Sequence, residues 1–284
     1  MMASMAGFTL NDTAIKSIGV DIPLFQVIAL RGMATSVVIV LIAIYLKALI
    51  FRLPEGQWRL VAVRTGSEMA ATYFFLTALM QMPLANVTAI LQVLPLTVTL
   101  AGAVWFREAV GWRRMLSILI GFVGVLLIVR PGPEGFNTFA LYAVVAVFFI
   151  TLRDLSTRRM SDEVPSLLVT VCASVGVMAF GLVGTIGQEW VAVTQLGAMK
   201  LGAATLFLVI GSLTSVMMMR VGDVSFVAPF RYTGIVFALV IGFVVFGDWP
   251  DLVTLIGAGI VVASGVFTLL REGHLKRQEK RARM

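Results

Sequence analysis

The chain has 284 residues, of which 59% are hydrophobic and 13% are charged, with a net charge of +7 and a mean hydropathy of +0.98. Charged residues make up about a quarter of a soluble domain, so this composition excludes a soluble protein. It indicates an integral membrane protein built from helices, because the apolar runs have helical length rather than the alternation of barrel strands.

Ten apolar segments of about 20 residues, bounded by charges, proline and glycine, follow one another along the chain. They cover residues 2–19, 24–46, 60–80, 84–105, 114–130, 138–158, 164–187, 199–219, 224–246 and 252–271. The connections between them are short, which is typical of antiparallel neighbouring helices. We therefore expect an all-α polytopic membrane protein with ten transmembrane helices.

Lysine and arginine gather in the even-numbered connections and in the C-terminal tail, whereas the odd-numbered connections hold only Arg130 and, at a span edge, Lys200. By the positive-inside rule, both termini are expected in the cytoplasm, beneath a bacterial inner (plasma) membrane. The basic tail, residues 274–284, is expected to rest on anionic membrane lipid rather than on nucleic acid.

The sequence contains an internal repeat that covers much of the chain. Residues 78–132 align with residues 217–273, so that Gln92 falls on Arg231 and Phe106 falls on Phe246. This pattern predicts a first five-helix repeat in residues 1–132 and a second in residues 133–273. Since each repeat holds an odd number of spans, the two are expected to be inverted relative to each other.

A second alignment concerns the first span of each repeat. Asn11 and Asp12 match Arg153 and Asp154, which lie 142 residues later. Each aspartate is followed four residues later by a base, Lys16 or Arg158, on the same helix face. Two interpretations stay open. In the first, each aspartate forms a local ion pair with its base, which stabilises both charges at the membrane interface. In the second, Asp12 and Asp154 take part in gating or proton coupling.

Span 3 carries two ionisable residues and a tyrosine inside the membrane, where charges are costly and face a cavity or a partner. Arg64 is expected to reach the cytoplasmic surface with its long side chain. Glu68 lies about one turn deeper and Tyr73 lies five residues beyond it. Glu68 is a candidate for substrate binding or proton coupling, and Tyr73 is a candidate for substrate binding.

Gln92 and Arg231 occupy equivalent places in spans 4 and 9, each near a proline, Pro95 or Pro229, that loosens its helix. A guanidinium group beside Tyr232 suits a carboxylate or an aromatic ring of a ligand. Gln92, Arg231 and Tyr232 are therefore candidate substrate-binding residues. The alternative is that Arg231 is neutralised by a structural pair with one of the membrane carboxylates.

Several other polar or small residues are interpreted as helix anchors, cavity lining or packing positions. Arg31 is interpreted as a helix anchor, whereas Asn11, Ser67 and Ser212 are candidates for polar cavity lining, and Asn11 is also a candidate for substrate binding. The glycines of spans 5 and 10 indicate close helix packing and leave open a monomer or a homodimer; they are Gly121, Gly124, Gly257, Gly259 and Gly265.

The sequence has one cysteine, Cys172, and one histidine, His274 in the tail. An internal disulfide and a cysteine or histidine metal site are thereby excluded. Neither an acidic cluster for magnesium nor a G-x-x-x-x-G-K-[ST] phosphate loop is present. We expect no metal, no cofactor and no enzymatic activity.

The chain resembles the ten-helix EamA-type carriers of the drug/metabolite transporter superfamily. The resemblance rests on Asn11-Asp12 with Lys16, Pro23 leading to Arg31, Pro95 running into Glu108, and Asp154. It rests further on Gly121-x-x-Gly124 before Arg130-Pro131-Gly132, on Ala228-Pro229-Phe230-Arg231-Tyr232 and on Phe246-Gly247-Asp248. The branch most similar holds S-adenosylmethionine and riboflavin uptake carriers.

This resemblance implies a central cavity lined by spans 1, 3, 4, 6, 8 and 9 that opens to each side in turn. The expected function is secondary active transport of a small metabolite, S-adenosylmethionine-, riboflavin- or amino-acid-like, across the inner membrane. The alternatives are an exporter of drugs or amino acids on the same fold and a membrane receptor or scaffold that transports nothing.

Overall fold

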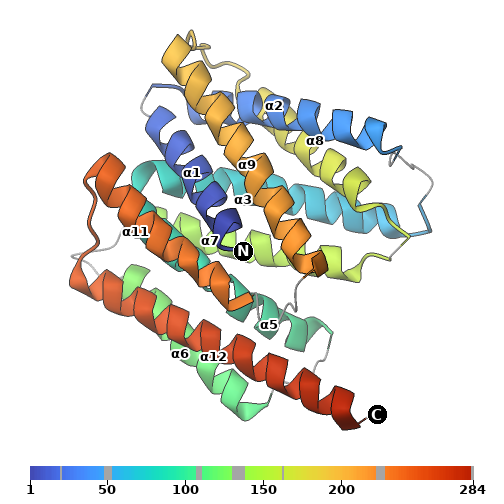
Figure 1. The fold of residues 1–284 in the computed structure, drawn as a ribbon. Helices are drawn as coiled ribbons and strands as arrows, with labels where there is room; N and C mark the ends of the chain where they lie inside the picture. Colours follow the sequence, from blue (N-terminus) through green and yellow to red (C-terminus); the bar gives the residue numbers. More distant parts are fainter. Residues whose placement is uncertain are drawn as a thin grey trace.

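The computed structural model describes residues 1–19, 21–47, 53–106, 111–129, 138–161, 163–221 and 228–282, and every regular element within them is helical (Figure 1). The elements are α1 (Met2–Ile18), α2 (Leu24–Tyr45), α3 (Gln57–Gln81), α4 (Leu84–Leu91), α5 (Leu94–Trp105), α6 (Trp112–Val129), α7 (Thr138–Arg159), α8 (Ser166–Gly184), α9 (Gln195–Val221), η1 (Ala228–Tyr232), α11 (Thr233–Phe246) and α12 (Leu252–Ala282).

Each predicted span has its helical counterpart, apart from the start of span 9, where residues 224–227 lie outside the described residues. Within the described residues, six helical stretches are long and apolar enough to cross a membrane by length and composition, and α6 and α11 contribute shorter apolar helices. The all-helical membrane architecture predicted from hydropathy is confirmed.

Two spans are interrupted where the sequence places a proline. The fourth span is divided into α4 and α5 at Gln92 and Val93. Pro95 has no N–H to offer the carbonyl of Leu91 four residues earlier, so the regular ladder ends there. In the described part of the ninth span, the 3-10 turn η1, which contains Arg231, precedes the regular helix α11.

The helices pack most closely in four pairs, which are α3 with α7, α2 with α8, α6 with α12, and α1 with α9. Figure 1 shows α2 beside α8 at one edge of the bundle and α6 beside α12 at the opposite edge, with α3, α7, α1 and α9 between them. Every one of these pairs joins a helix of residues 1–132 to a helix of residues 133–273. The two halves are therefore interleaved rather than separate.

The α6–α12 pair shows what the glycines do. A Cβ atom added at Gly124 would lie 2.8 Å from the carbonyl oxygen of Gly257, and one added at Gly257 would lie 2.7 Å from that of Gly124. Close approach of two backbones requires small residues on both helices. The predicted packing role is confirmed for these two residues, whereas Gly259 faces open space with no atom within 4 Å.

Candidate functional site

A cavity of about 570 Å³ lies between α1, α2, α3, α7, α8 and α9. Its wall is mostly apolar, with a small set of charged and hydroxyl side chains set into it. This composition is typical of a small-molecule site, in which a few polar groups orient a ligand among apolar contacts. Its polar lining residues include Arg31, Thr35, Arg64, Glu68, Arg153 and Ser212.

Helix geometry explains how these groups share one wall. Arg31 and Thr35 are four residues apart on α2, and Arg64 and Glu68 are four residues apart on α3. Side chains at that spacing lie above one another on the same helix face. Each helix therefore presents a polar stripe to the cavity, and its other faces pack against apolar neighbours or face outward.

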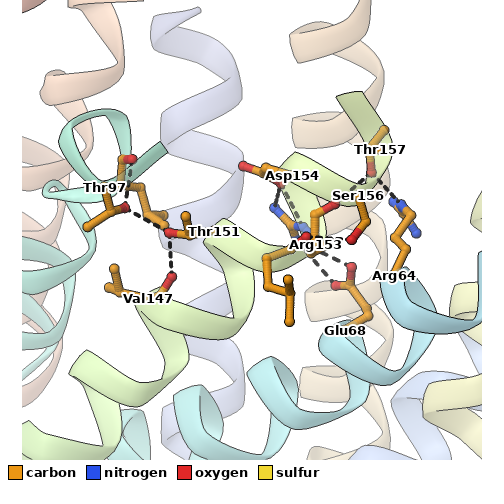
Figure 2. A network of polar contacts seen from close by, with 11 residues as sticks. Arg64, Glu68, Thr97, Val147, Thr151, Arg153, Asp154, Ser156 and Thr157 are labelled. Atoms are coloured by element: carbon orange, nitrogen blue, oxygen red, sulfur yellow. Dashed lines mark hydrogen bonds and ion pairs between the residues drawn. The ribbon is translucent and has the colours of Figure 1, made fainter. Parts of the chain in front are cut away.

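Arg153 on α7 joins two carboxylates at the edge of the cavity (Figure 2). Its Nη2 lies 2.9 Å from Oδ1 of Asp154, and its Nη1 lies 3.4 Å from Oε2 of Glu68. Paired and hydrogen-bonded charges are the form in which ionised groups persist away from water. Glu68 and Asp154, two candidates from different helices, are thereby connected through a third residue.

Asn11 and Asp12 make the equivalent contact on α1. The Nδ2 of Asn11 donates a hydrogen bond of 2.8 Å to Oδ1 of Asp12, just as Nε of Arg153 donates one of 2.9 Å to Oδ1 of Asp154. Arg31 lies close enough to interact electrostatically with Asp12 and Glu68. Three arginines and three carboxylates thus gather in and beside the cavity.

Arg64, which the sequence predicts to reach the cytoplasmic surface, extends to Thr157 in the last turn of α7. Its Nε donates a 2.9 Å hydrogen bond to the hydroxyl of Thr157 on α7 (Figure 2). Its Nη1 is buried and has no hydrogen-bond partner among the described residues. The guanidinium stays in the cavity wall because α7 offers it an acceptor there.

Lys16 does not form the local pair with Asp12 that their spacing allows. Its ammonium group donates to the carbonyl oxygens of Leu79 at 3.2 Å and Met82 at 2.5 Å, at the C-terminal end of α3. The last carbonyls of a helix have no intrahelical donor, and a cation near them is favourable. Lys16 therefore ties the end of α1 to the end of α3.

Gln92, Arg231 and Tyr232 form a group apart from this cavity, whose described lining residues include none from spans 4 and 9. The Nε2 of Gln92 donates to the backbone carbonyl of Arg231 at 3.4 Å, which joins the two helix interruptions. Tyr232 is 4% exposed, and its ring packs on Gly265 of α12. The described residues show no ion pair between Arg231 and a carboxylate, so its interpretation as a structural pair finds no support.

Tyr73 belongs to an aromatic cluster rather than to the described cavity lining. Its ring stacks on Phe25 of α2 at 5.6 Å between centroids and meets Phe180 of α8 edge-on at 6.3 Å. Tyr73 lies one residue beyond Thr72, which does line the cavity. The cluster therefore closes the space between α2, α3 and α8 next to the cavity.

The sequence-based candidates thus divide into two sets. Glu68 and Ser212 line the cavity, and Asp12 and Asp154 stand beside its arginines. Arg31 and Arg153 are cavity residues that sequence reasoning did not propose for the site. The signal for Arg153 in the sequence is its alignment with the candidate Asn11.

Residues that could hold a metal are not apparent. In the part of the chain that the structure describes, no group of three or more histidine, cysteine, aspartate or glutamate residues is arranged to hold an ion. Glu68 and Asp154 are instead occupied by Arg153.

The comparisons with known proteins agree with this architecture. Residues 1–130 match the profile of the EamA-like transporter family. A solved crystal structure covering 94% of this chain and 96% of its own has a TM-score of 0.62 at 22% identity, which supports the fold alone.

Three curated relatives cover most of both chains. The riboflavin transporter of Vibrio cholerae is 27% identical over 86% of this chain and 83% of its own. The S-adenosylmethionine uptake transporter of Rickettsia bellii is 23% identical over 95% and 92%. The pseudopaline exporter CntI of Pseudomonas aeruginosa is 24% identical over 93% of each. These findings confirm the expected resemblance to EamA-type carriers of the drug/metabolite transporter superfamily, and the names of the relatives support a membrane transporter.

Proposed function

Starting from this kinship with EamA-like transporters, we propose that the chain is a secondary active transporter that moves a small metabolite across a bacterial inner membrane by alternating access. The observation that carries the proposal is the cavity, which is lined by helices of both halves and holds paired and unpaired charges. Intramembrane ionisable groups mark substrate and ion pathways.

The pattern of helix contacts supports two repeats that exchange places. If residues 1–132 are exchanged with residues 133–273, the pair α3 with α7 becomes α9 with α1, and the pairs α2 with α8 and α6 with α12 become themselves. All four closest pairs are thus preserved. Inverted repeats of this kind give a carrier two exchangeable end states around one site.

Two contacts at the ends of the helices follow the same exchange. The ammonium of Lys16 lies 5.3 Å from the ring centroid of Phe246, and the guanidinium of Arg158 lies 5.2 Å from that of Phe106. Lys16 and Arg158 are repeat equivalents, and so are the two phenylalanines. In our proposal these cation–ring contacts belong to the closures at opposite ends of the transport path.

Within this function, Asp12 and Asp154 are proposed to bias the outer and inner closures, because each lies on the helix that carries one of these cations. Glu68 is the first choice for proton coupling, since protonation would release it from Arg153. The proposed substrate contacts outside the described cavity lining are Arg231, Tyr232, Gln92, Tyr73 and Asn11.

The test uses the purified chain in proteoliposomes loaded with S-adenosylmethionine, riboflavin or amino acids, with uptake of the labelled compound followed by counterflow. Arg231→Ala is expected to abolish uptake and leave the protein folded. Arg59→Gln, on the exposed first turn of α3, is the matched control and is expected to retain it. Unchanged kinetics for Arg231→Ala would remove that residue from the site.

Two alternatives have distinct outcomes. The first alternative is outward transport on the same fold, which the similarity to an exporter supports. It would show as accumulation of the substrate in inside-out vesicles. A receptor or scaffold would bind a ligand in the cavity and give no flux in either orientation.

A further inference from the structure

A groove of about 460 Å³ runs along the exposed face of the α6–α12 pair, at the edge of the bundle opposite α2 and α8 (Figure 1). Its walls include Leu116 and Ile120 of α6 and Phe267 of α12, which are 49%, 47% and 47% exposed. The residues that line this α6–α12 groove are distinct from those that line the cavity of about 570 Å³. The groove is therefore a separate site, and in a membrane it faces lipid.

The two hydroxyl groups in the α6–α12 groove are already paired. Oγ of Ser117 donates a 2.8 Å hydrogen bond to the carbonyl oxygen of Ser264, and Oγ of Ser264 donates one of 2.8 Å to that of Ile260. Apart from Arg113 and the indole of Trp112, the other described lining residues are apolar. Buried polar groups need partners, and these walls leave none unpaired, so they suit a hydrocarbon chain rather than a polar ligand.

The two helices run antiparallel along the groove. Ser117 meets Ser264. Seven residues further along α6, Gly124 meets Gly257, which lies seven residues earlier in α12. Arg271, which lies four residues beyond the last lining residue of α12, is therefore at the end of the groove where α6 begins.

The groove has the length and the depth of an acyl chain. Along α6 it extends from Arg113 to Ile120, and this distance is about 10 Å at 1.5 Å for each residue. The hydrocarbon of one leaflet is about 15 Å thick. Trp112 begins α6 and is 70% exposed, and exposed tryptophans are enriched at the level of the lipid headgroups. The groove therefore runs from headgroup level through most of one leaflet.

The headgroup end of the groove is positively charged. Arg113 lies there, with its guanidinium carbon 5.3 Å from the centroid of the Trp112 ring. Arg271 lies at the same end, on the face of α12 that lines the groove. The first backbone N–H groups of α6 have no intrahelical acceptor and also favour negative charge. An anionic headgroup matches this end, and an acyl chain matches the rest.

A second copy of the chain is the competing occupant. Gly259 and Ala263 are small, exposed and one turn apart on α12, which allows another helix to approach closely. Two copies related by an axis along the membrane normal would, however, bring their Arg113 groups to the same depth at the contact. Like charges at one level oppose that contact, whereas an anionic lipid neutralises them.

We propose that the α6–α12 groove binds an acyl chain of a phospholipid whose anionic headgroup lies at Arg113 and the first turn of α6. This site lies apart from the proposed transport path and does not rest on the transport function.

The experiment is native mass spectrometry of the full chain in detergent, with dioleoyl phosphatidylglycerol or dioleoyl phosphatidylcholine added at equal concentration. The two lipids have the same acyl chains and differ in net charge. The attraction of one basic residue for an anionic lipid corresponds to about a fivefold difference in affinity. Phosphatidylglycerol should therefore be retained at least about fivefold more strongly, and equal retention of the two lipids would overturn the inference.

Variants locate the lipid. Arg113→Gln should remove most of the preference for phosphatidylglycerol, whereas Arg59→Gln, on the exposed first turn of α3, should leave it unchanged. Ala263→Trp fills the groove from an exposed position and should lower the retention of both lipids. An undiminished preference in Arg113→Gln, or undiminished retention in Ala263→Trp, would contradict the assignment.

The same spectra report the oligomeric state. A monomer that carries phosphatidylglycerol supports the lipid site. A dimer that Ala263→Trp converts into a monomer would assign the groove to a second copy and rule the lipid site out.

Discussion

Arg153 should be more important to stability than either carboxylate that it joins. Replacing it with glutamine leaves Glu68 and Asp154 without the one cation that contacts both, while Arg64 acts on them from further away. Replacing Glu68 with glutamine instead leaves Arg153 still bound to Asp154 at 2.9 Å. Both substitutions remove the 3.4 Å contact between Arg153 and Glu68, but only the first leaves two carboxylates without a contacting cation.

The exposure of these side chains sets the size of the effect. Arg153 is 28% exposed, Glu68 25% and Asp154 38%, so the group lies between a buried pair and a surface pair. Stranding a partner of a fully buried pair costs about 3–5 kcal/mol, and an exposed pair contributes roughly 0–1 kcal/mol. We expect a loss of about 2 kcal/mol for Arg153→Gln and about 1 kcal/mol or less for Glu68→Gln.

The assay is thermal unfolding of the purified variants in one detergent, which should show Tm lowered by roughly 5 °C for Arg153→Gln and about 2 °C for Glu68→Gln. The loss of unfolding free energy in the double variant should be smaller than the sum of the two single losses by about 1 kcal/mol, because the two residues are in contact. Equal losses for the two single variants, or strict additivity in the double variant, would refute the bridging role of Arg153.

Two further predictions concern packing and access. Gly257→Ala should destabilise the chain by about 1–3 kcal/mol in the same unfolding assay, because the new methyl group meets a facing backbone carbonyl at 2.7 Å. Gly259→Ala, where nothing lies within 4 Å, should cost nothing measurable. In a Cys172→Ser background, Ser212→Cys should react with a water-soluble maleimide, because position 212 lines the cavity. Ala78→Cys, at a position that is fully buried, should not react, and equal labelling of both would argue against an accessible cavity.

The sequence by itself determined the membrane class, the helical spans and where two of them are interrupted. These features depend on local chemistry. A stretch of about 20 apolar residues must be helical to satisfy its backbone in lipid, and a proline such as Pro95 removes a donor wherever it lies. The alignment of Asn11 and Asp12 with Arg153 and Asp154 also came from the sequence, and the structure shows equivalent contacts at both places.

Only the tertiary structure decided which of the charged residues meet. Arg153 and Glu68 are 85 residues apart in the sequence. The sequence favours a helix anchor for Arg31, whereas the structure places it in the lining of a cavity between α2 and α3. Lys16 donates to the carbonyls at the end of α3 and not to Asp12, because those carbonyls have no intrahelical donor. In a membrane, lipid and protein interior are equally apolar, so hydrophobic patterning does not reveal which face of a helix meets a neighbour. Packing between small residues and ion pairs between residues distant in the sequence determine which helix faces meet. The cavity forms between those faces.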